Sequence, residues 1–135
     1  MVSYKNNLKV GTGSVVITGM GDDYKGSTKT VNFYIDPAKS SISKIAKYTS
    51  KTVKKNALKV TVKNGKGATG VEIAYRVKGT TKWTKVRTTV GSKVLKNLKA
   101  GKQYQVTVRS YTKNSAGKVT NYSGWSATKT SAKVK

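Results

Sequence analysis

The sequence predicts an all-β protein, built as an antiparallel β-sandwich or barrel, and three observations indicate this fold class. Apolar and polar residues alternate in several short runs, as half-buried antiparallel strands require. Turns rich in glycine and asparagine separate these runs at hairpin-like spacing. No stretch repeats apolar residues at i, i+3, i+4 and i+7 over three turns, so we expect no amphipathic helix.

The clearest strand patterns lie in the second half of the chain. Valine, isoleucine, leucine or tyrosine recurs at every second position of three runs: Leu58–Val62, Val71–Val77 and Tyr104–Val108. Four turn signals interrupt the same region: Asn64–Gly67, Lys78-Gly79, Ala100-Gly101 and Asn114–Gly117. Residues 42–55 come nearest to a helical pattern, but their threonines and serines favour an extended strand.

Proline marks a predicted boundary between two parts of the chain. The only proline, Pro37, follows the apolar run Val31–Ile35, and proline cannot continue a central strand. We therefore expect a small β module over residues 1–37, a serine-rich linker or lead strand over 38–45, and the main domain over 46–135. The longest run of large aliphatic residues is Val15–Ile17, so we expect neither a transmembrane span nor the core of a signal peptide.

Composition excludes most catalytic chemistry. The 135 residues include no cysteine and no histidine, which removes thiolate nucleophiles, histidine bases, disulfides and Cys/His metal sites. Glycosidases need paired carboxylates and hard-cation sites usually need several oxygen ligands, whereas this chain has four acids: Asp22, Asp23, Asp36 and Glu72. The Asp22-Asp23 pair lacks the spacing of a calcium loop and is typical of a turn. We expect no enzyme, no metal site and no cofactor.

The net charge of +24 predicts an affinity for polyanions. The charge is uneven, because residues 1–45 carry +3 and residues 46–135 carry +21. Lysine outnumbers arginine by 25 to 3. Specific phosphate and base readers favour the planar fork of arginine, while lysine is a strongly hydrated point charge. The composition therefore indicates a solvated basic surface rather than a specific phosphate reader.

The second half of the chain resembles a fibronectin type III module of the lysine-rich kind found in surface and secreted proteins of Gram-positive bacteria. The resemblance covers about residues 42–135 and rests on five segments: 58–63, 67–76, 82–86, 95–109 and Tyr122-Ser123-Gly124-Trp125-Ser126. It implies an antiparallel β-sandwich. It also implies that Leu98, Gly101 and Tyr104 form a tyrosine corner, in which the Tyr104 hydroxyl bonds to backbone just upstream.

The same resemblance raises a question about the tryptophans. The family usually has a tryptophan on its second strand, where this chain has Val62. We expect Trp83 or Trp125 to compensate, and the resemblance implies that Trp125 lies in or near the core. The alternative is that Tyr75, Trp83, Tyr104 and Trp125 form a platform on which sugars stack.

Residues 1–37 resemble the C-terminal half of a small bacterial Ig-like repeat. Five segments carry this likeness: Tyr4–Asn7, Val10–Gly13, Val15–Gly19, Gly21–Gly26 and Thr30–Ile35. The likeness implies a β-hairpin or a three-stranded remnant with an open edge. Open edges pair with other strands, so we expect this part either to dock on the second module or to form a homodimer.

One candidate binding surface emerges from the strand alternation. If the apolar residues of 71–77 and 104–108 point inward, Arg76, Arg109 and Tyr111 point outward. Neighbouring strands then bring Lys85 or Arg87 to the same face. We predict a polyanion site there, formed by Arg76, Lys85, Arg87, Arg109 and Tyr111.

Two functions remain open. The first is a non-catalytic module of an exported bacterial cell-surface protein, acting as a spacer or adhesion segment and binding anionic wall polymers or glycans. The chain would then be extracellular, as a fragment without its own signal peptide. The second is a basic protein that binds nucleic acid non-specifically. No helix-turn-helix, zinc finger or RNA-binding aromatic motif is visible, so we favour the surface module.

Overall fold

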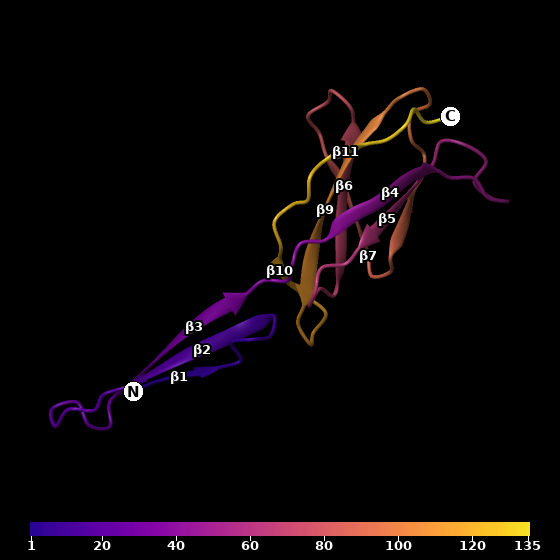
Figure 1. The fold of residues 1–135 in the computed structure, drawn as a ribbon. Coiled ribbons are helices and arrows are strands. Elements are labelled where there is room, and N and C mark those ends of the chain that lie inside the picture. The colour runs from indigo at the N-terminus through magenta and orange to yellow at the C-terminus, as the bar shows by residue number, and fades with distance from the viewer. The chain divides into compact units, whose positions relative to one another are not determined.

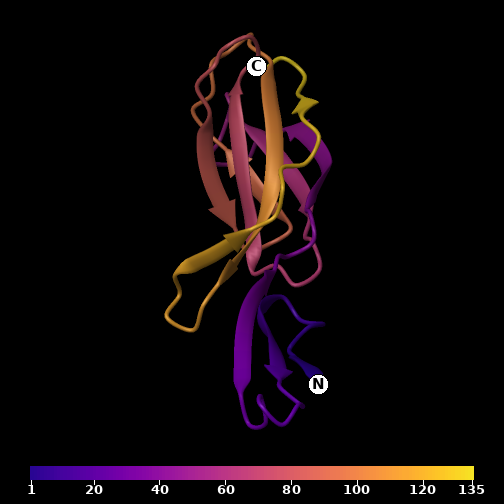
Figure 2. The same cartoon turned by 90° about the vertical axis from the view of Figure 1, so that its left-hand side faces the viewer.

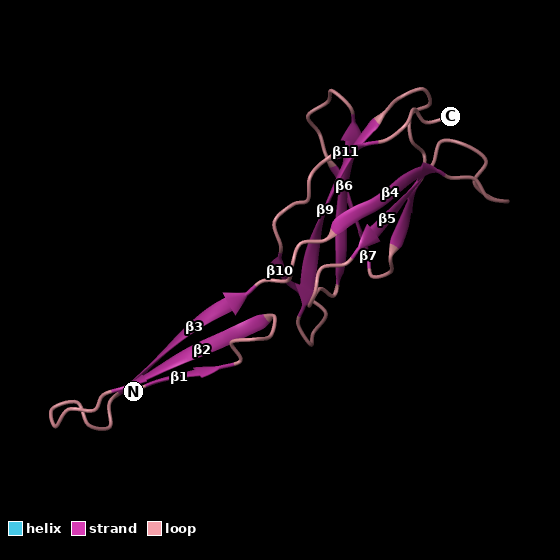
Figure 3. Cartoon of the chain, viewed as in Figure 1, coloured by secondary structure: helices cyan, strands magenta, loops and turns pink.

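The computed structural model describes residues 1–135 and confirms the all-β, antiparallel prediction (Figures 1 and 3). It contains no helix, so no segment could cross a membrane as a helix. The strands are β1 (Val2–Lys5), β2 (Gly11–Thr18), β3 (Thr28–Ile35), β4 (Ser41–Lys47), β5 (Leu58–Lys63), β6 (Gly70–Val77), β7 (Thr84–Thr88), β8 (Ser92–Leu95), β9 (Tyr104–Lys113), β10 (Val119–Tyr122) and β11 (Lys129–Thr130).

The chain divides into two compact units, Met1–Asp36 and Pro37–Lys135. Unit 1 has four lysines and three aspartates, a net charge of +1. Unit 2 has 24 basic residues and Glu72 as its single acid, a net charge of +23. The division falls one residue before the predicted one, and nearly all of the charge belongs to unit 2.

Residues 38–45 are an integral part of unit 2 rather than a linker. The carbonyl of Ala38 accepts a 2.6 Å hydrogen bond from the Ser110 hydroxyl, and the Ser40 and Ser110 hydroxyls lie 2.7 Å apart. Ser41–Lys47 then forms β4, which pairs with β5. Ser40 and the Ala38 carbonyl thus bond the entering chain to β9, so only the lead-strand part of this prediction agrees with the structure.

Unit 2 is a sandwich of two antiparallel sheets. The β5 sheet has the order β4-β5-β8, and the β6 sheet has the order β10-β9-β6-β7. The short strand β11 also pairs with β9, so β10 and β11 follow one another along the same edge of that strand. Figure 2 shows β7, β6 and β9 in one layer and β4 and β5 in the layer behind.

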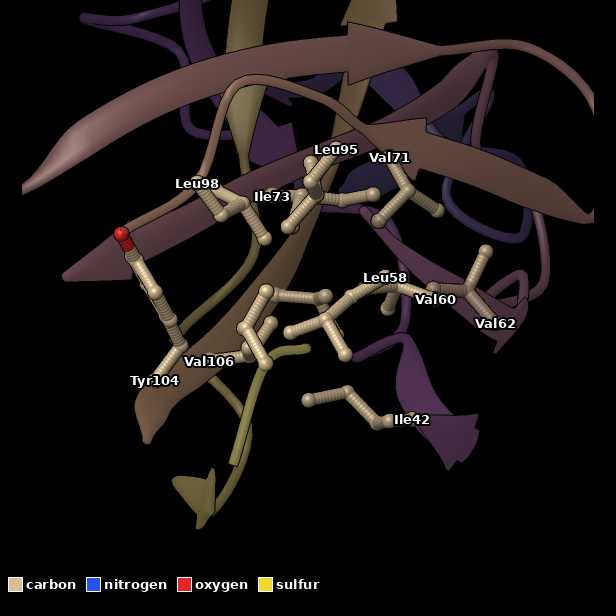
Figure 4. Close-up of a cluster of buried hydrophobic side chains, with 12 residues drawn as sticks. Ile42, Leu58, Val60, Val62, Val71, Ile73, Leu95, Leu98, Tyr104 and Val106 are labelled. Carbon is tan, nitrogen blue, oxygen red and sulfur yellow. The ribbon is translucent and has the colours of Figure 1, made fainter. Parts of the chain in front are cut away.

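The inward faces of both sheets meet in one hydrophobic core (Figure 4). The predicted alternation accounts for it, because Val60, Ile73, Val106 and Val108 are all fully buried. Burying an aliphatic side chain of this size contributes about 1.5–3 kcal/mol, so the eleven aliphatic residues of the core, together with Tyr104, supply the main driving force for folding. Val62, which stands where the resemblance led us to expect a missing tryptophan, belongs to the same core.

The tyrosine corner expected from the resemblance is present. Leu98 and Tyr104 are both 5% exposed, and the Tyr104 hydroxyl accepts a 2.8 Å hydrogen bond from the backbone N–H of Lys99. Gly101 has φ +72°, a left-handed conformation that glycine adopts without strain. In Figure 4 the Tyr104 ring stands at one end of the core with its oxygen toward the Leu98 segment.

Unit 1 is a three-stranded antiparallel sheet with the order β1-β2-β3. The register places Val2, Ile17 and Lys29 in one row, then Tyr4, Val15 and Val31, then Gly13 and Phe33. One face of the sheet is therefore mostly apolar and the other polar. The apolar face is poorly covered, since Val2 is 52% exposed and Val31 is 47% exposed.

Removing the Tyr104 hydroxyl should destabilise unit 2. Tyr104→Phe leaves the Lys99 N–H without its acceptor, which should lower the free energy of unfolding by about 1–2 kcal/mol. Tyr75→Phe is the matched control, because the Tyr75 ring lies 6.3 Å from that of Tyr104 and its hydroxyl makes no hydrogen bond within the protein. Urea denaturation measures both; equal losses in the two variants would contradict the corner's role.

The exposed apolar face of unit 1 should support self-association, since unit 1 carries little charge to oppose it. We expect light scattering to report a mass that rises above 14.6 kDa with concentration. Val31→Lys, on the apolar face, should suppress this rise, whereas Thr30→Lys, on the polar face, adds the same charge and should not. A concentration-independent mass of 14.6 kDa would refute the homodimer.

Candidate functional site

The predicted polyanion site lies on the outer face of the β6 sheet. Cross-strand pairing places Glu72 opposite both Arg87 and Arg109, and places Arg76 opposite Gln105. Between these two rows lies Ala74, which pairs with Lys85 on one side and Thr107 on the other. Alternation correctly brings the arginines to one face, but the structure assigns them different roles.

Glu72 is the centre of this face. It is the only acid of unit 2, and it is 4% exposed. Its Oε2 accepts a 3.0 Å bond from Arg87 Nε, and its Oε1 accepts bonds of 3.0 and 2.7 Å from Nε and Nη2 of Arg109. A buried carboxylate requires such partners, because burial without them would cost several kcal/mol. Two of the three arginines therefore balance an internal charge.

The Arg87 guanidinium also reaches Tyr122, whose hydroxyl oxygen lies 2.8 Å from Nη2. Burial alone would lower the pKa of Arg87, but Tyr122 and the hydrogen-bonded Glu72 carboxylate raise it above its usual value. The network therefore favours the charged form of Arg87.

Cations and aromatic rings alternate across the same face. Arg76 lies 4.3 Å from the centre of the Trp83 ring, and Arg109 lies 3.6 Å from Tyr122 and 4.4 Å from Trp125. A guanidinium over an indole or phenol ring is attracted by the ring's quadrupole, which contributes about 0.5–2 kcal/mol per contact. Because Arg109 is also bound to Glu72, the buried carboxylate indirectly fixes the orientation of Trp125.

The prediction that Tyr111 is an exposed reader is wrong, since Tyr111 is only 2% exposed. It does lie on the outward side of β9, but its partner in the register is Gly70. A β-carbon added to Gly70 would lie 2.6 Å from the Tyr111 hydroxyl oxygen, so the ring covers the space that glycine leaves open. Strand alternation predicted the correct side of the sheet for Tyr111. It does not indicate that the Tyr111 ring packs over Gly70.

Of the four predicted cations of the site, Arg76 and Lys85 are the two that do not pair with Glu72. Arg76 is half-buried and donates through Nε to Gln105 at 2.9 Å. Lys85 is exposed and makes no ion pair with any carboxylate. The five residues therefore do not form a single anion-binding cluster.

Trp125 lies outside the core, contrary to the expectation from the resemblance. It is half-buried on the outer face of the β6 sheet, as is Trp83, and neither belongs to the core cluster. The segment carrying Trp125 is held against β9, because the Ser126 N–H donates to the Val108 carbonyl at 2.7 Å. Neither tryptophan fills the core beside Val62; Val62 and its aliphatic neighbours pack there themselves.

Two adjoining hollows at one end of the sandwich bring together cations that the sequence did not predict to lie close to one another. The larger, of about 460 Å³, includes Arg76, Lys82, Lys96 and Lys99 in its lining. The smaller, of about 320 Å³, includes Lys54, Lys55 and Lys96. The two share Lys96 and Asn97, so we treat them as one feature and name it the basic end groove.

No carboxylate lines the basic end groove. Five of its cations come from three connections that are distant in sequence: the segment between β4 and β5, the β6–β7 turn and the β8–β9 loop. The sixth, Arg76, lies near the end of β6. The sequence did contain a signal, because an antiparallel sandwich places these connections at the same end. The strand positions alone do not show this; the order of the strands in the sheets is also needed.

Comparisons with known proteins identify the fold alone. No family model matches the chain, and no curated protein matches it. A solved chain described as "Myokine structure" superposes with a TM-score of 0.52 and 18% sequence identity, covering 75% of this chain and all of that one. At this identity the match confirms the antiparallel β architecture and carries no information about function.

Breaking the Glu72 network should destabilise unit 2 even though it removes a positive charge from a strongly basic protein. Arg109→Gln leaves Glu72 with Arg87 alone, and should lower the free energy of unfolding by about 1.5–3 kcal/mol. Lys59→Gln, at an exposed position of β5, removes the same charge and should be neutral or slightly stabilising. Urea denaturation separates the outcomes, and equal stability of the two variants would contradict a structural role for Arg109.

Proposed function

We propose that this chain is a non-catalytic, fibronectin type III-like module of an exported Gram-positive surface protein, which spaces or presents neighbouring domains and binds anionic wall polymers or glycans. The observation that carries the proposal is the state of the charge in unit 2. Its only acid, Glu72, is buried and ion-paired with two arginines. Of its 21 lysines, 20 are exposed and Lys93 is half-buried.

An uncompensated lysine surface of this kind attracts polyanions and repels other cations. Each exposed lysine carries a hydrated charge that contributes to long-range attraction without requiring a fixed geometry. This suits a ligand that is a repeating polyelectrolyte with phosphate or carboxylate groups, such as a teichoic acid or an acidic glycan. It does not suit a small ligand that must be held in one orientation.

The basic end groove is the part of this surface most favourable for a polymer. Its two hollows adjoin, so neighbouring anionic groups of one chain can occupy both, and six different cations surround them. Low-dielectric walls concentrate the electrostatic field in a cleft relative to a flat surface. We therefore assign the strongest polyanion contact to this end of unit 2.

A comparison of two triple variants tests this assignment. Lys54→Gln, Lys55→Gln and Lys96→Gln together remove three cations of the basic end groove. Lys66→Gln, Lys113→Gln and Lys118→Gln remove three exposed lysines at the opposite end of the sandwich, two from turns and one from the end of β9. At equal net charge, the groove variant should bind teichoic acid at least about tenfold more weakly than the control variant.

Binding of the unmodified protein to teichoic acid, heparin and DNA at low and physiological salt completes this test. We expect the unmodified protein to bind the wall polymer or heparin, and we expect this binding to persist at physiological salt. Equal losses in the two triple variants would remove the groove assignment. Equal binding to all three polymers that disappears at physiological salt would reduce the function to charge alone, and preferential binding to DNA would favour the nucleic-acid alternative.

A further inference from the structure

A second hollow, separate from the basic end groove, lies on the outer face of the β6 sheet. It has a volume of about 250 Å³ and is lined by Ala74, Trp83, Lys85, Thr107 and Trp125, which we name the tryptophan pocket. We propose that the tryptophan pocket binds one carboxylated pyranose ring of an acidic polysaccharide. This inference deepens the proposed function and rests on it.

The floor of the pocket is low because its residues are small. Ala74 and Thr107 are cross-strand partners on β6 and β9, and they are 2% and 7% exposed. The adjoining rows of the same face carry long side chains, with Arg76 and Gln105 on one side and Glu72 and Arg109 on the other. Two small neighbouring residues, Ala74 and Thr107, between two pairs of large ones leave a depression, and Lys85 extends the same row on the other side of Ala74.

The two indoles lie at opposite ends of this depression. Trp83 is stacked by Arg76, from the row on one side of Ala74, and Trp125 is stacked by Arg109, from the row on the other side. Each guanidinium occupies one face of its indole and holds the ring in place. Both rings also line the pocket, so apolar surface remains available to a ligand between them. A pre-positioned site of this kind binds without the entropy loss of ordering its side chains.

The polar groups around the pocket select the ligand. Neither indole N–H donates to a protein acceptor, and Lys85 makes no ion pair. The Thr107 hydroxyl already donates to the Ser126 carbonyl at 2.8 Å. The free groups are therefore donors, and the ligand must present acceptors together with an apolar face.

A carboxylated pyranose satisfies both requirements. The C–H groups on one face of the ring pack against an indole, and its hydroxyl oxygens can accept from the indole N–H groups. Its carboxylate can pair with Lys85, whose ammonium lies 5.8 Å from the centre of the Trp125 ring. The pocket is smaller than most drug-binding cavities, of about 300–1,000 Å³, which suits one sugar ring rather than a larger aromatic ligand.

Intrinsic fluorescence tests the inference directly, because Trp83 and Trp125 are the only two tryptophans of the chain. Trigalacturonic acid, added to the full chain at physiological salt, should change the tryptophan emission in a saturable way. A neutral trisaccharide of galactose should bind at least about tenfold more weakly, since it lacks the partner of Lys85. No saturable change with the acidic trisaccharide would overturn the inference.

Two variants locate the binding. Lys85→Gln should weaken trigalacturonic acid binding by about tenfold, whereas Lys118→Gln, which removes an exposed lysine at a distant turn, should leave it unchanged. Ala74→Leu should abolish binding by filling the pocket floor, with thermal unfolding to verify that the variant is folded. Equal effects of Lys85→Gln and Lys118→Gln would show a response to net charge and would overturn the site.

Failure of the pocket is distinguishable from failure of the proposed function. If wall polymer binds and the groove variant weakens that binding, but trigalacturonic acid leaves the emission unchanged, the pocket inference falls and the function stands. If no polyanion binds at all, both fall. A short DNA oligonucleotide that changes the emission at physiological salt more strongly than the acidic sugar would mean that bases stack between the indoles, which would also overturn the inference.

Discussion

The outer face of the β6 sheet depends on one ion-paired carboxylate. Glu72 is buried on a strand flanked on both sides by strands that carry arginine, and it accepts three hydrogen bonds from Arg87 and Arg109. Those arginines in turn stack on the aromatic rings of the face, including Trp125 and Tyr122. A single negative charge therefore holds Arg109, and through it the Trp125 side of the tryptophan pocket, whereas Trp83 is held by Arg76, which bonds to Gln105. Without the Glu72 carboxylate, the guanidiniums of Arg87 and Arg109 would repel one another on an already basic surface.

This arrangement separates the basic residues into two groups. Arg87 and Arg109 are structural, because both are ion-paired with the buried Glu72 within the sheet. The exposed lysines have no internal partners of that kind, and they give unit 2 its attraction for polyanions. The excess of lysine over arginine thus reflects a difference in role: the planar fork of arginine suits the bidentate contact with Glu72, and the hydrated ammonium suits an exposed surface. The proposed ligands follow from the lysines and the tryptophans together.

Strand positions and the division near Pro37 could be predicted from the sequence, because each depends on local patterns, whereas the tyrosine corner was expected from the resemblance. Period-two alternation predicts strands at Leu58–Val62 and Tyr104–Val108 regardless of the strands with which they pair. Contacts that depend on register could not be predicted in this way. Glu72 gives no sign in the sequence that it pairs with two arginines, and the burial of Tyr111 follows from its position opposite Gly70. Trp125 was assigned to the core by family resemblance, whereas the segment between β10 and β11 places it on the outer face.

A double-mutant cycle between Glu72 and Arg109 tests the central claim most directly. The free energies of unfolding of Glu72→Gln, Arg109→Gln and the double variant, with that of the unmodified protein, give the coupling energy between the two side chains. A charged, largely buried pair should give a coupling of about 1.5 kcal/mol or more, with the double variant less destabilised than the sum of the single ones. A coupling near zero would contradict the claim that Glu72 organises this face, and would mean that other contacts hold the arginines, the rings and the pocket between them.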